Sequence, residues 1–413
     1  MIDACSLEKT PMLTVGDALE RIRMTIQAIG EEEIISLKTA LGRVLAEDVY
    51  SAINIPHECN SAMDGYAFIS EDAAQTQPLT LQLIGTSWAG KPFQGQLQRG
   101  QCVRIFTGAV LPEQADSVIM QEHIQRDGEQ IHFPANTRTH QNVRAIGEDV
   151  AQDSLLCVQG KKLTAVDLAL LATAGVGTVN VYRRLNIAIF STGDELAALG
   201  HPLSTGQIYD SNRYLLLGLL NDPCFHVTDL GVIRDNKQAL SDAFTTAANN
   251  HDVIISTGGA SVGDADYVKE VLTECGHINF WKLAIKPGKP LTFGNIGACY
   301  VFGLPGNPVS AQVTFQQIVA PALQQLTGTA MTHPLQLSAI CTSVLKKSAG
   351  RQEFQRGILR NEHGKLFVDS AGHQGSNILS ALSIANCYIV LPSDCQGVDV
   401  GDKVIVEPFS VFL

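Results

Sequence analysis

The sequence has no long hydrophobic run. Nowhere in its 413 residues does an apolar stretch approach the roughly 20 residues needed to span a membrane. Residues 1–11 also lack the hydrophobic core of a secretory signal peptide. We therefore expect a cytoplasmic protein that does not associate with membranes.

Positive charge is scarce as well. Lys and Arg number 29 against 41 Asp and Glu, which gives a net charge of -12, and no basic stripe runs along the chain. A general nucleic-acid binder needs such a stripe to displace counterions from phosphates. We therefore expect no nucleic-acid partner, and any anionic ligand must be held by a local group of cations.

Several signatures of metal binding and catalysis are missing. The 10 cysteines form no C-x-x-C pair, and no His/Cys group has zinc-ligand spacing, so we expect reduced packing thiols. The sequence also has no P-loop, no G-x-G-x-x-G fingerprint and no Ser-His-Asp arrangement. These absences argue against Walker-type ATP hydrolysis and dinucleotide redox chemistry.

What is present begins with helix signals at both ends of a β-rich region. The length predicts about three domains of ordinary size. Thr14 with Asp17, and Thr164 with Asp167, form capping boxes in front of amphipathic patterns. Between them, residues 54–149 carry short apolar runs separated by Gly, Pro and Asn. This pattern predicts a small β-rich module inserted into a helical one.

From Leu185 onward, strand and helix patterns alternate. The expected strands are 187–192, 226–233 and 252–257, and the expected helices are 214–222, 239–250 and 267–275. Such alternation predicts a doubly wound, mostly parallel α/β sheet with ligands at the carboxyl ends of its strands. After Pro321 the pattern becomes β again. Residues 354–370 and 398–409 read as hairpins, which predicts a C-terminal barrel or sandwich.

Acidic side chains follow each of the three predicted strands. Glu195 follows the first, Asp235 the second, and the Gly-rich loop with Asp264 and Asp266 the third. Because these strand ends share one edge of the sheet, the carboxylates should meet and could hold a divalent cation. An alternative makes Asp266 only the cap of the helix that starts near Tyr267.

A group of lysines comes next, at Lys282, Lys286 and Lys289. Ammonium groups beside glycines suit a phosphate or other oxyanion. An exposed Pro-Gly turn is the default explanation of the last two, but their position against the acidic edge favours a functional role. Residues 305–308 read Pro-Gly-Asn-Pro, which fits a pocket wall or a plain helix entry. The residues alone therefore predict a phosphorylated-ligand or oxyanion site with a divalent cation.

A series of longer motifs identifies a family that the chain resembles. In order, they are NSAMDGYA, RIFTGA, RAIGEDV, FSTGDEL, GQIYDSN, ISTGGASVGDADY, FWKLAIKPGKP, GLPGNPVSA, EFQRG and GHQGS. This order resembles the molybdopterin molybdenumtransferase (MoeA) family, to which the E-domain of gephyrin is related. The resemblance covers nearly the whole chain.

The resemblance implies a multidomain α/β plus β fold. It implies an elongated helical linker domain (1–53 and 150–183), an inserted β-rich domain (54–149), a doubly wound α/β molybdopterin-binding domain (184–330) and a C-terminal β-barrel domain (331–413). It also implies a homodimer whose active-site cleft is shared between subunits.

The activity that the resemblance implies is insertion of molybdate into adenylylated molybdopterin, with Mg²⁺-dependent hydrolysis of the adenylate and release of AMP. Glu195, Asp235 and Asp266 would hold Mg²⁺ and position water, because Mg²⁺ prefers hard oxygen ligands. Lys282 and Lys286 would stabilise charge on the phosphate.

The same resemblance assigns substrate-binding residues. Arg356 and Ser376 would bind the molybdate oxyanion, and Pro305 and Pro308 would shape its pocket. The loop after the third strand would contact substrate through Ser256, Gly258, Gly259 and Ser261.

Three further residues match positions that reach the cleft from the partner subunit, namely Asp64, Thr107 and Asp149. By spacing alone their motifs are polar loops. One departure affects this region, because residues 144–146 read Arg-Ala-Ile where family members often carry an arginine cluster. The partner subunit should then bring less positive charge.

Two other functions stay open. One is a molybdopterin adenylyltransferase, which the α/β domain alone would suggest, and the other is a gephyrin-like scaffold without catalysis. The retained Arg356 and Ser376 argue against the first, and Asp235, Asp266 and Lys286 together argue against the second. Partners expected from the resemblance are a molybdopterin adenylyltransferase and molybdoenzymes that accept the cofactor.

Overall fold

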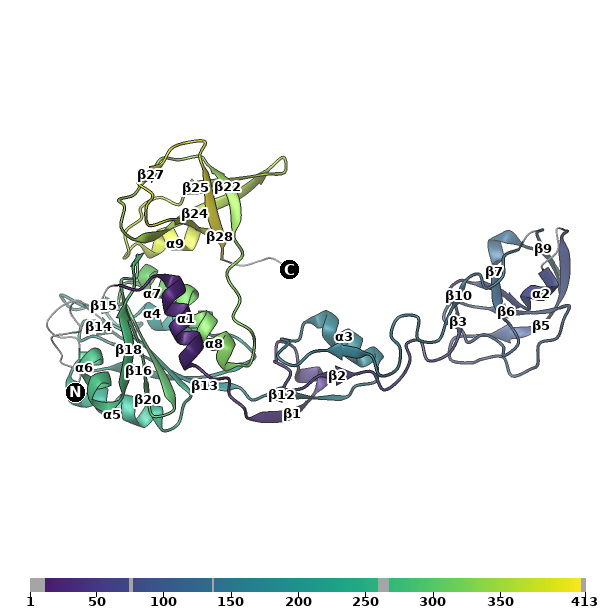
Figure 1. Cartoon of the computed structure of the whole chain (residues 1–413), viewed down its shortest axis with the longest axis horizontal. Coiled ribbons are helices and arrows are strands. Elements are labelled where there is room, and N and C mark those ends of the chain that lie inside the picture. The colour runs from purple at the N-terminus through teal and green to yellow at the C-terminus, as the bar shows by residue number, and fades with distance from the viewer. Residues whose placement is uncertain (1–11, 74–76, 136, 259–266, 410–413) are drawn as a thin grey trace. The chain divides into compact units, whose positions relative to one another are not determined.

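The computed structural model describes residues 12–73, 77–135, 137–258 and 267–409 (Figure 1). The chain divides into two compact units. Unit 1 comprises Met1–Ile34, Gly42–Ala46 and Asn180–Leu413, and unit 2 comprises Ile35–Leu41 and Glu47–Val179. The boundaries of these two units differ from those of the four domains predicted from the sequence. The four-domain boundaries stay a prediction.

The centre of unit 1 is a six-stranded sheet. In spatial order its strands are β16 (Phe225–Ile233), β13 (Leu185–Thr192), β17 (Val253–Thr257), β21 (Cys299–Leu304), β20 (Pro290–Ile296) and β18 (His277–Lys282). The first four strands run parallel, whereas β20 is antiparallel to both of its neighbours. The predicted mostly parallel sheet is confirmed, with an antiparallel edge added.

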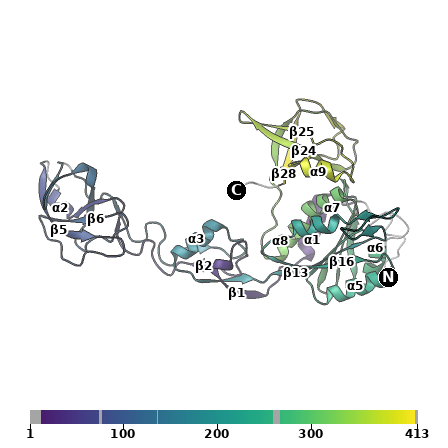
Figure 2. The same ribbon diagram turned by 180° about the vertical axis from the view of Figure 1, so that it is seen from behind.

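Helices cover both faces of this sheet because its strands are apolar on both sides. Ile187 and Ile189 of β13 lie in one core cluster, and Ala188 and Phe190 lie in the other. This alternation follows from the two-residue period of a strand. The first face packs against α1 (Val15–Thr25), α4 (Asn212–Leu219), α7 (Pro308–Thr314), the π-helical turn η4 (Phe315–Val319) and α8 (Ala320–Leu326). The second packs against α5 (Lys237–Ala248) and α6 (Tyr267–Cys275), as Figures 1 and 2 show.

The C-terminal part of unit 1 is a closed five-stranded barrel. Its strands in order are β24 (Gln352–Glu362), β25 (Lys365–Ser370), β22 (Leu337–Cys341), β28 (Lys403–Pro408) and β26 (Cys387–Leu391), with β26 pairing back to β24. The predicted hairpin at 354–370 is confirmed, since Glu362 pairs with Lys365 across His363 and Gly364. Both turn residues have positive φ, 52° and 81°, as a type I′ turn requires.

The second predicted hairpin, at 398–409, is wrong. Gly401 does turn the chain with φ of 98°. However, β27 (Gly397–Val398) pairs with β23 (Leu345–Lys346), while β28 pairs with β22 and β26. Closing the barrel gives β28 partners on both sides, so the local turn does not decide its pairing.

The barrel and the α/β sheet form one continuous body. A short strand, β19 (Ile285–Lys286), pairs in parallel with β24 and places Lys286 opposite Glu353. Phe354 and Tyr388 of the barrel belong to the same apolar core as the α/β sheet. The buried Glu407 of the barrel accepts a 2.7 Å hydrogen bond from Gln317 of η4. Residues of the two domains are therefore held in fixed register where they meet.

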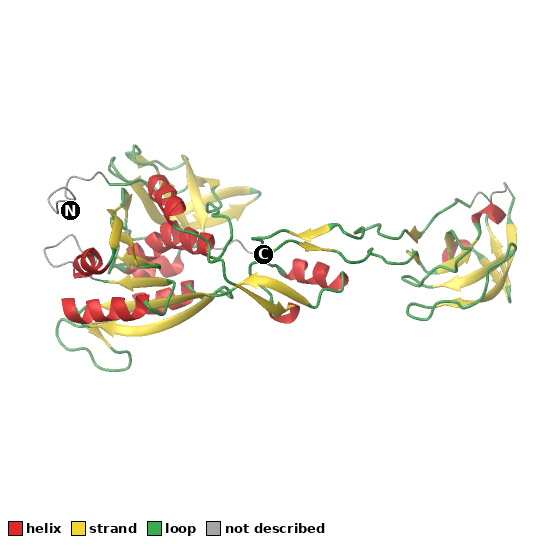
Figure 3. Ribbon diagram, turned by 60° about the horizontal axis from the view of Figure 1, so that its bottom comes forward, coloured by secondary structure: helices red, strands yellow, loops and turns green. Residues whose placement is uncertain are grey.

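Unit 2 contains the predicted β-rich module. Its six-stranded sheet runs β7 (Ser117–Met120), β4 (Gly65–Phe68), β6 (Gln101–Ile105), β5 (Leu79–Ser87), β9 (Gln130–Phe133) and β8 (Gln125–Asp127), and strands dominate this module in Figure 3. Thr164 and Asp167 form the predicted capping box of α3 (Ala165–Thr173), as Thr14 and Asp17 do for α1.

The remaining elements are short. Five two-stranded pairs are β1 (Glu32–Ser36) with β12 (Thr178–Tyr182), β2 (Val49–Tyr50) with β11 (Leu155–Cys157), β3 (Asn60–Ser61) with β10 (Val143–Arg144), β14 (Leu196–Ala197) with β15 (Ile208–Tyr209), and β23 with β27. Single helical turns are η2 (Leu37–Thr39), α2 (Ser70–Ala73), η3 (Gln121–His123) and α9 (Leu379–Ile384). Over the described ranges, no helix is both long enough and apolar enough to cross a membrane.

Candidate functional site

Two of the predicted metal-binding carboxylates meet at the carboxyl edge of the sheet. Asp235 follows β16 and accepts a 3.3 Å hydrogen bond from the hydroxyl of Thr192, at the end of β13. Burial raises the pKa of Asp235, and the negative charges of Asp194 and Glu195 raise it further, while the Thr192 bond opposes the shift. The edge therefore crowds like charges together.

The third predicted ligand, Asp266, lies outside the described residues, as do Gly259 and Ser261. Within the ranges that are described, no group of three or more His, Cys, Asp and Glu side chains could hold a metal ion. The structure thus brings Glu195 and Asp235 together and leaves the complete Mg²⁺ site a prediction.

Two glycines allow this edge to form. Gly258 has φ of 85°, and a Cβ there would lie 2.1 Å from the carbonyl oxygen of Thr192. Gly193 has φ of 152°, and a Cβ there would lie 2.6 Å from the carboxylate of Glu195. Any larger residue would push the ends of β13 and β17 apart or displace Glu195.

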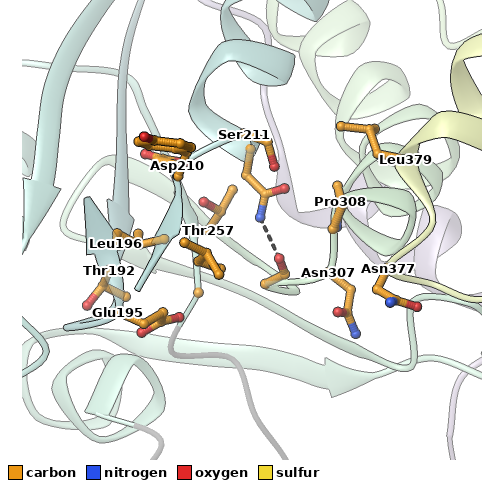
Figure 4. A pocket seen from close by; sticks show the side chains of 15 residues that line it. Thr192, Glu195, Leu196, Asp210, Ser211, Thr257, Asn307, Pro308, Asn377 and Leu379 are labelled. Carbon is orange, nitrogen blue, oxygen red and sulfur yellow. Dashed lines mark hydrogen bonds between the residues drawn. The ribbon is translucent and has the colours of Figure 1, made fainter. Parts of the chain in front are cut away.

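A cavity of about 310 Å³ opens at this edge, and we call it the sheet cavity. It is lined by Thr192, Glu195, Leu196, Ile208, Tyr209, Asp210, Ser211, Asn212, Thr257, Gly258, Gly306, Asn307, Pro308, Asn377 and Leu379. Figure 4 shows Thr192 and Glu195 on one side and Asn377 and Leu379 on the other. Apolar side chains beside carboxylates and amides suit a planar heterocycle that carries polar groups.

The floor of the sheet cavity is held by hydrogen bonds. The amide of Asn212 donates to the carbonyl of Gly306 at 2.7 Å, the dashed line in Figure 4. The buried Asp210 accepts a 3.0 Å bond from Arg213, which also binds Asp229 at 2.8 Å. The Asn212 bond joins the start of α4 to the loop before α7, and the bond from Arg213 to Asp229 joins it to β16.

A second cavity, of about 330 Å³, lies against the barrel, and we call it the barrel cavity. It is lined by Lys286, Pro287, Gly288, Lys289, Pro290, Asn307, Ser310, Arg351, Glu353, Phe354, Gln355, Gln374, Gly375 and Ser376. Asn307 lines both cavities, so the two are neighbours. Three cationic side chains and two hydroxyls give the barrel cavity the chemistry of an oxyanion site.

Arg356, a predicted oxyanion ligand, is fully buried and is not among the lining residues of either cavity. Its guanidinium donates to the carbonyls of His373, Gln374 and Gly375 at 2.6, 3.3 and 3.1 Å. The side chain of Gln374 accepts a 2.8 Å bond from the backbone N–H of Arg356 and donates a 3.0 Å bond to the Arg356 carbonyl. Arg356 therefore holds the loop that carries Ser376 into the barrel cavity.

The remaining predicted residues of unit 1 occupy different surroundings. Lys286 lines the barrel cavity, but Lys282 lies 3.5 Å from the ring centre of Trp281 and lines neither cavity. Pro308 lines the sheet cavity, whereas Pro305 is buried and lines neither cavity. Ser256 is also fully buried on β17, and its hydroxyl has no hydrogen-bond partner among the described residues.

In unit 2, two of the three predicted cleft residues are joined. Asp64 accepts hydrogen bonds from the backbone N–H and the hydroxyl of Thr107, both at 2.8 Å. These bonds, with the nearby charge of Arg104, lower the pKa of the Asp64 carboxyl. Asp149 is exposed, and its backbone N–H binds Ile55 at 3.0 Å. All lining residues of the two cavities belong to unit 1.

Several residues that line the cavities were not predicted from the sequence. Asn307 lay inside the Pro-Gly-Asn-Pro motif, and Asp210 and Asn212 lay inside GQIYDSN, so the motifs themselves carried a signal. Glu353 likewise lay inside EFQRG, whereas Arg351 lay in no motif and lines the barrel cavity just before β24, the strand that pairs with β19.

Comparison with known proteins covers almost the whole chain. Residues 13–175 match the MoeA N-terminal region (domain I and II), 188–325 a probable molybdopterin binding domain, and 338–409 the MoeA C-terminal region (domain IV). A molybdopterin molybdenumtransferase from Haemophilus influenzae is 45% identical over 97% of this chain and 100% of its own length. Gephyrin from Dictyostelium discoideum is 32% identical over 95% of this chain and 62% of its own length.

Solved structures agree with this similarity. The molybdopterin biosynthesis moeA protein from Pyrococcus horikoshii OT3 superposes with a TM-score of 0.84 and is 29% identical. The match covers 97% of this chain and 100% of that one. The α/β domain and the closed barrel therefore belong to a known multidomain architecture.

Proposed function

The chain belongs to the MoeA family, and from this premise we propose how it works as a molybdopterin molybdenumtransferase, an enzyme of molybdenum cofactor biosynthesis. In this proposal the sheet cavity holds adenylylated molybdopterin, whose adenylate is hydrolysed at the acidic edge. The barrel cavity holds molybdate. The observation that carries the proposal is the meeting of an acidic and a cationic cavity at Asn307.

The acidic edge fits Mg²⁺ by its donor set. Glu195 and Asp235 offer the hard oxygen ligands that Mg²⁺ prefers. Burial first, and then the charges of Asp194 and Glu195, raise the pKa of Asp235, and a bound cation would favour its ionised form. We assign Asp266 as the third ligand on its motif alone. When bound, Mg²⁺ would neutralise charge on the phosphate oxygens.

The side chains of the acidic edge then have defined tasks in adenylate hydrolysis. The carboxylates of Glu195 and Asp235 orient a water toward the phosphoanhydride. Thr192 keeps Asp235 in place through its 3.3 Å hydrogen bond. Gly258 lets the end of β17 approach this edge closely, because its backbone lies against the carbonyl of Thr192.

The barrel cavity supplies positive charge and hydroxyl groups. Lys286 and Ser376 face a bound oxyanion, and Lys289 adds a second ammonium group. Arg356 acts here as a positioning residue, since its three bonds to carbonyls fix the loop of Ser376. Lys282 stays a proposed contributor to phosphate binding on the strength of its motif.

We further propose a cytoplasmic homodimer in which Asp64, Thr107 and Asp149 of unit 2 complete the cleft of the partner subunit. The bonds from Thr107 support this, because they hold the Asp64 carboxylate ionised and in one orientation. A molybdopterin adenylyltransferase would deliver the substrate, and molybdoenzymes would accept the product. Analytical ultracentrifugation tests the dimer, and a monomer at working concentration would contradict it.

The test of the function is a single incubation. Purified protein is mixed with adenylylated molybdopterin, molybdate and Mg²⁺, and AMP release and active cofactor are measured. We expect both products, and AMP release should require Mg²⁺ and increase with molybdate. Absence of molybdate-stimulated AMP release would contradict the proposal. Consumption of ATP with unmodified molybdopterin would instead indicate an adenylyltransferase.

A further inference from the structure

One side chain of the barrel cavity has the wrong charge for an oxyanion site. Glu353 is the one carboxylate among its lining residues, which otherwise include Lys286, Lys289 and Arg351. It is only 5% exposed. A buried carboxylate beside a bound dianion is strongly unfavourable unless a proton or a cation compensates it. Its presence in this cavity therefore calls for a functional explanation.

The contacts of Glu353 leave half of its carboxylate available. Oε1 lies 3.2 Å from Nζ of Lys286 and accepts a 3.0 Å bond from the amide of Gln355. Oε2 accepts no hydrogen bond from any residue that the structure describes. The pairing of β19 with β24 fixes Lys286 opposite Glu353, so the ion pair is built into the backbone register.

The charges around Glu353 are otherwise positive. Lys286 and Lys289 face it from the segment that includes β19, and Arg351 lies just before β24. Arg356 on β24 also interacts with Glu353 through charge. The residue opposite Glu353 on β26 is the apolar Leu391. An oxyanion that enters would meet three cations and one carboxylate.

A carboxylate in such a position can discriminate between oxyanions according to their basicity. If one proton is shared between Oε2 and an oxygen of the anion, repulsion becomes a charge-assisted hydrogen bond. Placing that proton is easier for a basic oxyanion such as molybdate, tungstate or phosphate than for sulfate, the anion of a strong acid. Sulfate would leave two negative groups in contact without a proton.

We propose that Glu353 determines the oxyanion specificity of the barrel cavity by sharing a proton with the bound anion, and that it thereby excludes sulfate. This inference rests on the proposed function, which places molybdate in that cavity. Glu353 also holds Lys286 in the correct place before the anion arrives, through the ion pair between the two domains.

The experiment measures binding rather than turnover. Calorimetric titrations of the full-length protein with sodium molybdate and with sodium sulfate are run in two buffers of different ionisation enthalpy. We expect wild type to prefer molybdate and to take up a proton from the buffer when molybdate binds. Glu353→Gln should tighten sulfate binding by about tenfold, because the neutral amide does not repel the dianion, and should abolish the proton uptake.

Two further variants make the result specific. Glu362→Gln removes the same charge from the exposed end of the same strand and should change neither quantity. Glu353→Asp keeps the carboxylate and should keep the preference for molybdate, which a purely structural role of Glu353 would not require. Proton uptake by the wild type tests the inference even if Glu353→Gln does not fold.

The contradicting outcomes are distinct. No proton uptake by wild type, or an unchanged molybdate-to-sulfate ratio in a folded Glu353→Gln variant, would overturn the inference alone. Failure of wild type to bind molybdate at all would overturn the assignment of the cavity, and the inference with it.

Discussion

The two cavities of unit 1 share a wall and differ in charge. The sheet cavity has two carboxylates, Glu195 and Asp210, and no Lys or Arg among its lining residues. The barrel cavity has three cationic residues and the single carboxylate of Glu353. Asn307 belongs to both. A chain with a net charge of -12 thus concentrates cations at one place and keeps them off the neighbouring acidic edge.

This difference separates two tasks that would otherwise interfere. In the proposed function, the Mg²⁺ that binds the adenylate phosphate needs carboxylate ligands, whereas carboxylates repel molybdate. On this proposal, adjacent cavities of different charge would let both ligands bind at once. The substitutions below should therefore affect one cavity without the other.

The largest expected effect comes from Asp235→Asn. Asp235 is a proposed Mg²⁺ ligand, and the neutral amide of Asn lacks the negative charge that binds the cation, so AMP release should fall by about 100-fold or more. Molybdate affinity, measured by calorimetry, should stay within about twofold because Asp235 does not line the barrel cavity. Equal losses of AMP release and molybdate binding would contradict the assignment of the two ligands to separate cavities.

A smaller effect is expected from Lys289→Met in the barrel cavity. Loss of one ammonium group should weaken molybdate binding by about tenfold, as loss of a charge-assisted bond does. Lys365→Met serves as the matched control, because Lys365 is exposed on β25. Unchanged molybdate affinity in Lys289→Met would remove this lysine from the anion site.

Arg356→Lys should act through the loop of Ser376. Lysine keeps the charge but cannot make the three carbonyl bonds of the guanidinium, so the fold should lose about 2 kcal/mol. Hydrogen exchange at residues 374–376 should accelerate, and molybdate affinity should fall several-fold. Weaker molybdate binding with unchanged exchange would favour a direct contact between Arg356 and the anion.

The smallest effect concerns stability and pH. The pKa of Asp235 is raised in the folded protein above its value in the unfolded chain. Asp235 therefore lowers the free energy of unfolding of the metal-free protein as pH rises from the unfolded pKa through the raised folded pKa. Asp235→Asn should therefore raise the melting temperature of metal-free protein at pH 7 by about 2 °C. Near pH 3 the gain should vanish. A gain that persists at low pH would mean that charge is not its cause.

Features set by nearby residues could be predicted from the sequence. The capping boxes at Thr14 and Thr164 are confirmed, as is the hairpin around His363 and Gly364. The placement of Glu195 and Asp235 within electrostatic reach of each other also followed, because parallel strands bring their carboxyl ends to one edge, while their metal-binding role stays a prediction.

Features that depend on distant pairing could not be predicted. The partners of β28 are set by closure of the barrel, so the local turn at Gly401 misled the hairpin prediction. The place of Glu353 depends on β19 meeting β24 across more than sixty residues of chain. The burial of Arg356 depends on the loop at 373–375 folding over it. No local pattern indicates these contacts.

The most direct test of the central claim is the position of molybdenum itself. Crystals of the Asp235→Asn variant, soaked in molybdate, are measured at the molybdenum absorption edge. We expect an anomalous peak in the barrel cavity, within hydrogen-bond reach of Lys286 and Ser376. A peak at the acidic edge beside Glu195, with none in the barrel cavity, would contradict that claim.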